Sequence, residues 1–175
     1  TWAGSLHYRR HLRTGAGWEA FSVMTALCTA SVLPLVLGDP RIVVFLQQRL
    51  GDSLIMPMVF LGIFPFCFLA GYLTPMYIDG YSQGRPEPAG RAYAVNIIGC
   101  VIGPLLASYV LLPFIGIKWS LLLLSVPFLC FSLLYGLRSE MRSGSNAGLI
   151  AVAVAFLLCS LFVSRSYEEN YEKAD

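Results

Sequence analysis

Two histidines, His7 and His11, stand four residues apart in a basic N-terminal segment, so on a helix they would share one face. Imidazole side chains at this spacing can bind a metal ion or a haem iron. No second pair of ligands accompanies them, and the neighbouring Arg9, Arg10 and Arg13 fit a contact with lipid headgroups equally well. His7 and His11 are therefore weak metal candidates, and we predict no metal and no other cofactor.

A second set of residues falls on one helical face within an apolar stretch, with steps of three or four residues: Tyr93, Asn96, Gly99, Gly103 and Ala107. Small residues let helix backbones approach closely in lipid. The Asn96 amide needs a hydrogen-bond partner there, because an unpaired amide in hydrocarbon costs several kcal/mol. We predict that this face packs against another helix, or alternatively lines a small polar cavity.

Sequence signatures of catalysis are missing elsewhere. There is no Gly-rich phosphate loop, no Ser-His-Asp set and no pair of carboxylates within an apolar run. The five cysteines all lie inside apolar runs without zinc or redox spacing, which indicates small packing residues. We therefore predict no catalytic residues. The lack of charge inside the apolar runs also argues against an autonomous ion-coupled pump.

Composition places the chain in the membrane class. Of its 175 residues, 57% are hydrophobic and 13% are charged, about half the charged fraction of a soluble domain. The mean hydropathy is +0.68. A net charge of +2 is too small to indicate a nucleic-acid partner.

Apolar runs of bilayer length organise the chain. We predict an all-α fold, a polytopic transmembrane helix bundle of about five spans plus one short interfacial amphipathic helix. A basic polar segment (1–17) precedes the transmembrane helical domain (18–164), and a polar acidic tail (165–175) follows it. The predicted spans are 18–38, 53–78, 91–115, 119–137 and 147–164. The interfacial helix, 40–50, has an N-cap acid and a proline at its start and Gly51 at its end.

Prolines and glycines occur both within and between these spans. A Gly- and Pro-rich loop is predicted from residue 79 to 91, and a sharp turn at 116–118. Kinks are expected where proline or glycine interrupts a long helix. The predicted kink positions are Pro57, Pro65, Gly71, Pro75, Pro104 and Pro113.

Two stretches resemble the membrane region of polytopic spermidine synthase-like proteins, in which several transmembrane helices precede an aminopropyltransferase-type domain. The matching residues are Gly71 to Pro75, then Gly90, Tyr93, Asn96, Gly99 and Gly103, and finally Leu112-Pro113 and Gly116. The resemblance implies a membrane module attached to, or descended from, a polyamine synthase-like enzyme. The chain begins without Met and ends in a charged stretch, so we expect a piece of a longer protein with any catalytic domain beyond residue 175.

The sequence favours an integral membrane module without its own active site, acting as an anchor or as a structural subunit of a membrane protein assembly. The alternatives are the membrane half of a spermidine synthase-like aminopropyltransferase and a small-molecule transporter fragment. The expected partners are the lipid bilayer and other membrane subunits or the rest of a longer chain, without nucleic acid. We expect a multi-pass protein integral to the bacterial inner (cell) membrane. A slight excess of Lys and Arg predicts that its N-terminal side is cytoplasmic.

Overall fold

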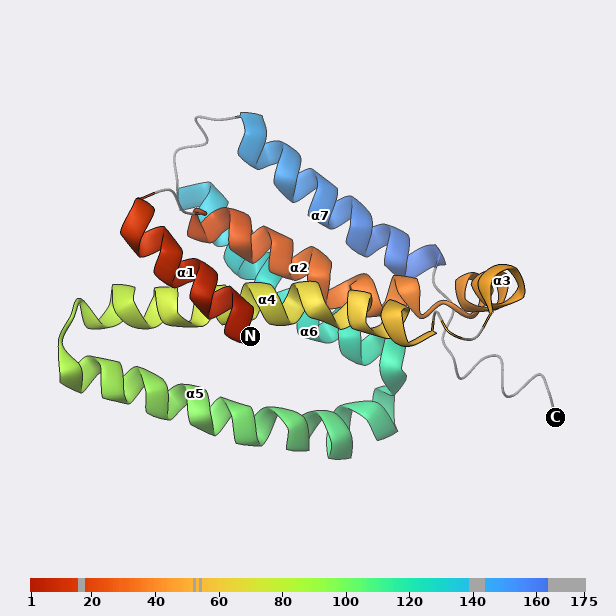
Figure 1. The fold of residues 1–175 in the computed structure, drawn as a ribbon, viewed down its shortest axis with the longest axis horizontal. Helices are drawn as coiled ribbons and strands as arrows, with labels where there is room; N and C mark the ends of the chain where they lie inside the picture. The colour runs from red at the N-terminus through yellow and green to blue at the C-terminus, as the bar shows by residue number, and fades with distance from the viewer. Residues whose placement is uncertain (16–17, 52, 54, 139–143, 164–175) are drawn as a thin grey trace. The chain divides into compact units, whose positions relative to one another are not determined.

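The computed structural model describes residues 1–15, 18–51, 53, 55–138 and 144–163 (Figure 1). Every element in this described part is a helix, in the order α1 (Trp2–Thr14), α2 (Ala20–Leu37), α3 (Pro40–Leu50), α4 (Ile55–Ser82), α5 (Pro86–Leu106), the π-helical η2 (Ala107–Leu111), α6 (Leu112–Arg138) and α7 (Gly144–Val163). The helices form two compact units. The first contains Thr1–Trp18 and Cys67–Gly116, and the second contains Glu19–Phe66 and the described residues from Ile117 onward.

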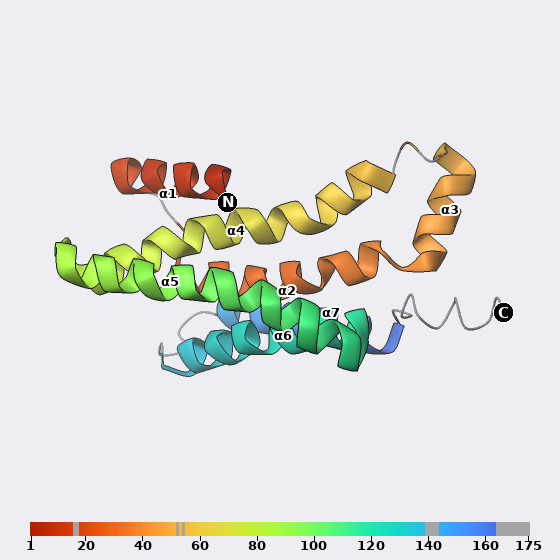
Figure 2. The ribbon, with the colours of Figure 1, turned by 90° about the horizontal axis from the view of Figure 1, so that it is seen from below.

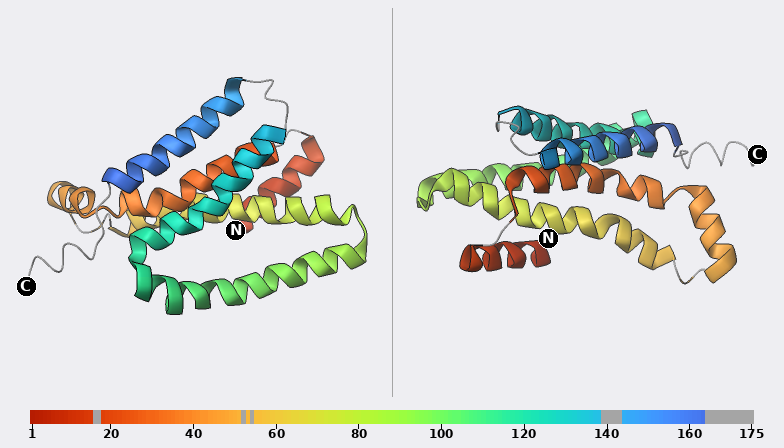
Figure 3. Two further views of the ribbon diagram at one scale, coloured as in Figure 1. Left: turned by 180° about the vertical axis from the view of Figure 1, so that it is seen from behind. Right: turned by 90° about the horizontal axis from the view of Figure 1, so that it is seen from above.

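The core of the second unit forms around α2. This helix is apolar on all sides, and ten of its eighteen residues are buried, as expected for a helix surrounded by others. Helix α7 runs alongside α2 (Figure 3). The Thr25 hydroxyl of α2 lies 2.5 Å from the Ser132 hydroxyl of α6, and it also donates to the Phe21 carbonyl at 2.9 Å. Among the described residues, no buried side-chain nitrogen or oxygen lacks a hydrogen-bond partner.

Helix α3 has the same bounds as the predicted short amphipathic helix, 40–50. It turns steeply away from the end of α2 (Figure 2). The Asp39 carboxylate accepts a hydrogen bond from the Arg41 backbone N–H at 2.9 Å, and Pro40 occupies the first helical position. Gly51, with φ of 80°, ends the helix in a conformation that suits glycine. Local capping residues thus account for both ends of α3.

The predicted loop from 79 to 91 is wrong in its extent. Helix α4 continues to Ser82 and α5 begins at Pro86, so only residues 83–85 connect them. Pro86 and Pro88 lie in the first turn of α5, where a backbone N–H has no helical partner and proline costs little. Gln83 and Gly84 have positive φ angles of 49° and 78°, which make the reversal tight.

The N-terminal segment predicted as merely basic and polar contains a 13-residue helix, α1, which ends at Gly15 in the left-handed conformation. The predicted tail, 165–175, lies outside the described residues.

Kinks were predicted in this part of the chain at Pro57, Pro65 and Pro75. All three prolines lie within α4, which is one continuous helix from Ile55 to Ser82.

The stretch after α5 contains two irregularities. The Leu112 N–H donates to the Ala107 carbonyl five residues back, which closes the π-turn η2. This π-turn lies between Pro104 and Pro113, which cannot donate to the helical ladder. Gly116 then has φ of 73° and ψ of 173°, so the helical path breaks at this residue within α6, as the predicted turn at 116–118 requires.

Among the described residues, three helices are long and apolar enough to cross a membrane: Ala20–Leu37, Met56–Ser82 and Pro86–Leu134. The apolar helix Ile150–Phe162 is shorter. The fold is therefore all-helical with membrane-spanning potential.

Candidate functional site

Helix α1 packs against α4 at two glycines of the first unit. A Cβ atom added to Gly4 would overlap the Phe68 carbonyl oxygen and lie 2.7 Å from the Tyr72 nitrogen. A Cβ atom added to Gly71 would overlap the backbone of Thr1. The two helix backbones touch here, which only residues without a side chain permit. Gly71 was predicted as a kink position, and the structure gives it a packing role.

This close approach brings together a cluster of ring side chains, of which Tyr8 and Tyr72 are buried. We call it the polar aromatic cluster: His7, Tyr8 and His11 of α1, Trp18, and Phe68 and Tyr72 of α4. Tyr72 is completely buried, and its hydroxyl oxygen lies 2.6 Å from His11 Nδ1. The same hydroxyl accepts a hydrogen bond from the Trp18 backbone N–H at 3.1 Å. Tyr72 therefore joins three segments of the first unit.

The two histidines have aromatic neighbours. The His7 ring lies 4.9 Å from the Trp18 ring and 5.8 Å from the Tyr72 ring, measured between centroids. The His11 ring stacks on Tyr72 with an interplanar angle of 5°. Within the described ranges, no three His, Cys, Asp or Glu side chains are grouped where they could hold a metal ion. The weak metal candidates His7 and His11 are thus part of a packing and hydrogen-bonding cluster.

Tyr8 forms the polar edge of this cluster. Its hydroxyl donates to the Asp79 carboxylate at 3.0 Å. Burial, and next the hydrogen bond to Asp79, raise the pKa of Tyr8 to about 12, above the ordinary 10.0. The neutral phenol is therefore favoured in the folded protein.

Alkaline pH is expected to weaken this contact. Because folding raises the pKa of Tyr8, the stabilisation is fully present below pH 10.0 and is lost as the pH rises to about 12. Ultraviolet titration of the tyrosines should show an ionisation step at a higher pH than that of an ordinary tyrosine, and Tyr8→Phe should remove this step. Asp79→Asn should move that step to lower pH, because it removes the neighbouring negative charge. An unchanged titration curve in both variants would contradict this assignment.

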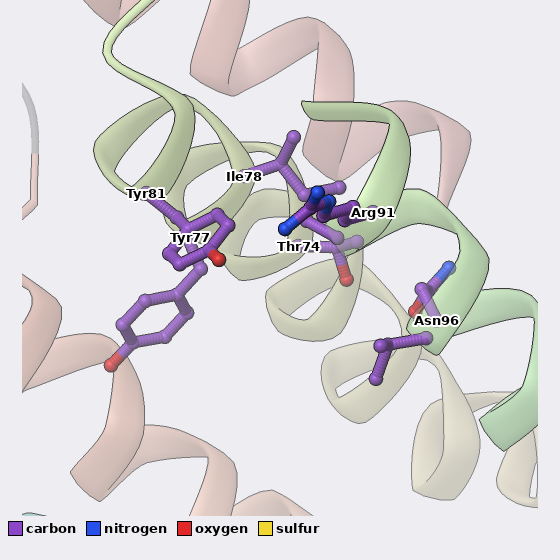
Figure 4. A pocket seen from close by; sticks show the side chains of 8 residues that line it. Thr74, Tyr77, Ile78, Tyr81, Arg91 and Asn96 are labelled. Carbon is purple, nitrogen blue, oxygen red and sulfur yellow. The ribbon is translucent and has the colours of Figure 1, made fainter. Parts of the chain in front are cut away.

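A cavity of about 500 Å³ lies on the opposite face of the same part of α4, between α4 and α5 (Figure 4). From α4 it is lined by Thr74, Tyr77, Ile78 and Tyr81, and from α5 by Arg91, Ala92, Val95 and Asn96. The α4 residues recur at intervals of three and four, so they form one helical face. The cavity combines an apolar wall with hydroxyl, amide and guanidinium groups.

Of the predicted face on the third span, only Asn96 lines this cavity. Tyr93, Gly99, Gly103 and Ala107 are not among its lining residues. A Cβ atom added to Gly99 or Gly103 would meet nothing within 4 Å in the described part of the chain. The predicted loop from 79 to 91 contains Tyr81, so the loop prediction excluded this residue from the helical face of α4. Thr74, Tyr77 and Ile78 lie within the predicted second span, and their helical spacing was a signal for the rest of this face.

No family model, curated protein or solved structure matches this chain. The chemistry of the site therefore has to be inferred from its own residues. In the described part of the chain, the cavity lining contains no carboxylate, histidine or cysteine that could act as a general base or nucleophile. Its residues are suited to binding a small amphiphilic molecule.

Proposed function

We propose that this chain is an integral membrane module without an active site of its own, which acts as an anchor or a structural subunit in a larger assembly. The observation that carries this proposal is the apolar surface of α5 and η2, in which no residue is buried. Val95 is 70% exposed and Ile97 is 61% exposed. Such a surface needs lipid or the helices of a partner to cover it.

The helix lengths support five crossings. The apolar stretch Pro86–Leu134 has 49 residues, which would extend for about 74 Å as one straight helix. This is more than twice the hydrocarbon thickness of about 30 Å. The break at Gly116 divides it into two lengths that each suit one crossing. Together with α2, α4 and α7, these make five spans, and α3 is the interfacial helix.

The native Cys100 tests membrane insertion. It is a free, exposed thiol near the middle of α5, so lipid should shield it from water. In a variant with Cys100 as its sole cysteine, we expect a membrane-impermeant maleimide to react at least about tenfold more slowly in membranes than in detergent, because the reactive thiolate requires water. The measurement is the labelled fraction over time.

The matched control is a sole cysteine at Arg85→Cys, in the turn between α4 and α5. This position should react in open membrane fragments without detergent. Equally fast labelling of Cys100 and of Arg85→Cys in such fragments would refute the insertion of α5. Release of the chain by alkaline carbonate would refute the whole membrane proposal.

A second proposed role is the membrane half of a spermidine synthase-like aminopropyltransferase. Its support is the motif residues around Tyr93 and Asn96 and the following Leu112-Pro113 and Gly116. The cavity between α4 and α5 gives separate support to a small-molecule role, whether in binding or in transport. We place this module in the bacterial inner membrane, where multi-pass helical proteins are expected.

A further inference from the structure

We propose that the cavity between α4 and α5 binds a zwitterionic glycerophospholipid whose headgroup ends in a primary ammonium, such as phosphatidylethanolamine. This inference rests on the proposed membrane location. It assigns the headgroup to Glu87 and Arg91, and the ester region to Asn96. The order of these residues along α5 is the order of the polar groups along such a lipid.

The charges at one end of the cavity select the headgroup. Arg91 lines the cavity, and its guanidinium lies 2.7 Å from the Glu87 carboxylate one helical turn earlier. Both side chains are exposed, at 73% and 78%, so both remain accessible to a ligand. The lipid phosphate pairs with Arg91 and its ammonium with Glu87. An anionic lipid lacks a group for Glu87 and is repelled by that carboxylate.

Asn96 lies about 7.5 Å further along the helix axis than Arg91. In the described part of the chain, its amide forms no hydrogen bond, although it borders the cavity. At the edge of the hydrocarbon, where water is scarce, an amide without a hydrogen-bond partner is unfavourable. The ester carbonyl of a glycerophospholipid supplies an acceptor for the Asn96 NH₂ group at the required depth.

The remaining walls suit the other parts of the lipid. Ile78, Ala92 and Val95 offer apolar contact to the glycerol backbone between the phosphate and the esters, while Tyr77 and Tyr81 fit the headgroup level, where aromatic side chains are enriched. A smaller cavity of about 130 Å³ in the second unit provides a contrast. Among the described residues, its lining has no charged or polar side chain to orient a headgroup: Pro34, Leu37, Gly38, Val43, Met58, Val59, Gly62 and Ile63.

Native mass spectrometry of the full chain in detergent tests this proposal. Phosphatidylethanolamine and phosphatidylglycerol with identical acyl chains are titrated separately, and the bound fraction is measured. We expect the wild-type chain to prefer phosphatidylethanolamine by about tenfold. Arg91→Gln should weaken phosphatidylethanolamine binding about tenfold, and Asn96→Leu should weaken the binding of both lipids. Glu87→Gln should abolish or reverse the preference.

Arg85→Gln is the matched control, because Arg85 precedes α5 and does not line the cavity. It should leave both affinities unchanged. The ratio of the two affinities in Glu87→Gln distinguishes a changed lipid preference from misfolding. An unfolded variant would lose the binding of both lipids, whereas a folded variant would change only its preference between them. Equal affinities in the wild-type chain, or equal losses in Arg85→Gln and Arg91→Gln, would overturn the lipid site.

Alkaline carbonate extraction of the same proteins separates the two proposals. A chain retained in the membrane without a lipid preference would refute the lipid site alone. A chain released by carbonate would refute the membrane module and, with it, the lipid site.

Discussion

Replacing Gly71 with alanine is expected to detach α1 from α4. The added methyl group would overlap the backbone of Thr1, which cannot move aside as a flexible side chain can. Overpacking of this kind costs about 1–3 kcal/mol, which corresponds to a factor of about 5 to 150 in the population of the opened state. Trypsin should therefore cleave at the arginines of α1, Arg9, Arg10 and Arg13, about 5 to 150 times faster in Gly71→Ala than in the wild type.

Gly80→Ala is the matched control on the same helix, because a Cβ atom there meets nothing within 4 Å. It should leave cleavage unchanged or slow it, since alanine favours a helix by up to about 1 kcal/mol over glycine. Similar cleavage rates in the two variants would contradict the close contact between α1 and α4.

Replacing Tyr72 with phenylalanine is expected to lower the free energy of unfolding by about 1–3 kcal/mol. The substitution retains the buried ring but removes the hydroxyl that bonds to His11 Nδ1 and to the Trp18 N–H. The cost arises because the partners, in part-buried hydrogen bonds, lose the hydroxyl of the buried Tyr72, and the phenylalanine ring keeps water from replacing it. Unfolding by SDS in mixed micelles, followed by tryptophan fluorescence, measures the change.

Tyr93→Phe is the control for this substitution, because Tyr93 is exposed and its hydroxyl has no hydrogen bond among the described residues. Its effect should remain within about 0.5 kcal/mol. If Tyr93→Phe destabilised the protein as much as Tyr72→Phe, the hydroxyl of Tyr72 would not hold the cluster together.

The polar aromatic cluster and the lipid cavity share the same part of α4. Tyr72 and Asp79 face α1, while Thr74, Tyr77 and Ile78 face α5. A helix with polar groups on two opposite faces is unusual in a membrane unless both faces are covered. Helix α1 covers one face, and the proposed phospholipid covers the other.

Prediction from the sequence succeeded where the signal was local. The residues Asp39-Pro40 and Gly51 define α3 through capping and backbone conformation, and Gly116 breaks the helical path through its positive φ angle. The loop prediction from 79 to 91 is wrong because a proline does not end a helix when it lies in the first helical turn. In the first turn of α5, Pro86 and Pro88 are compatible with a helix.

Local signals were thus enough to predict the helical class, the apolar lengths that suit a membrane and the ends of α3. These properties depend on composition and on residues within one or two turns of each other. Which side chains meet depends instead on the tertiary packing of the helices. The contacts of Tyr72 with His11 and of Tyr8 with Asp79 join residues 61 and 71 positions apart, and the α4 side of the cavity lies beyond the turn at 83–85. Such pairings depend on the close approach at Gly4 and Gly71, which no local pattern encodes.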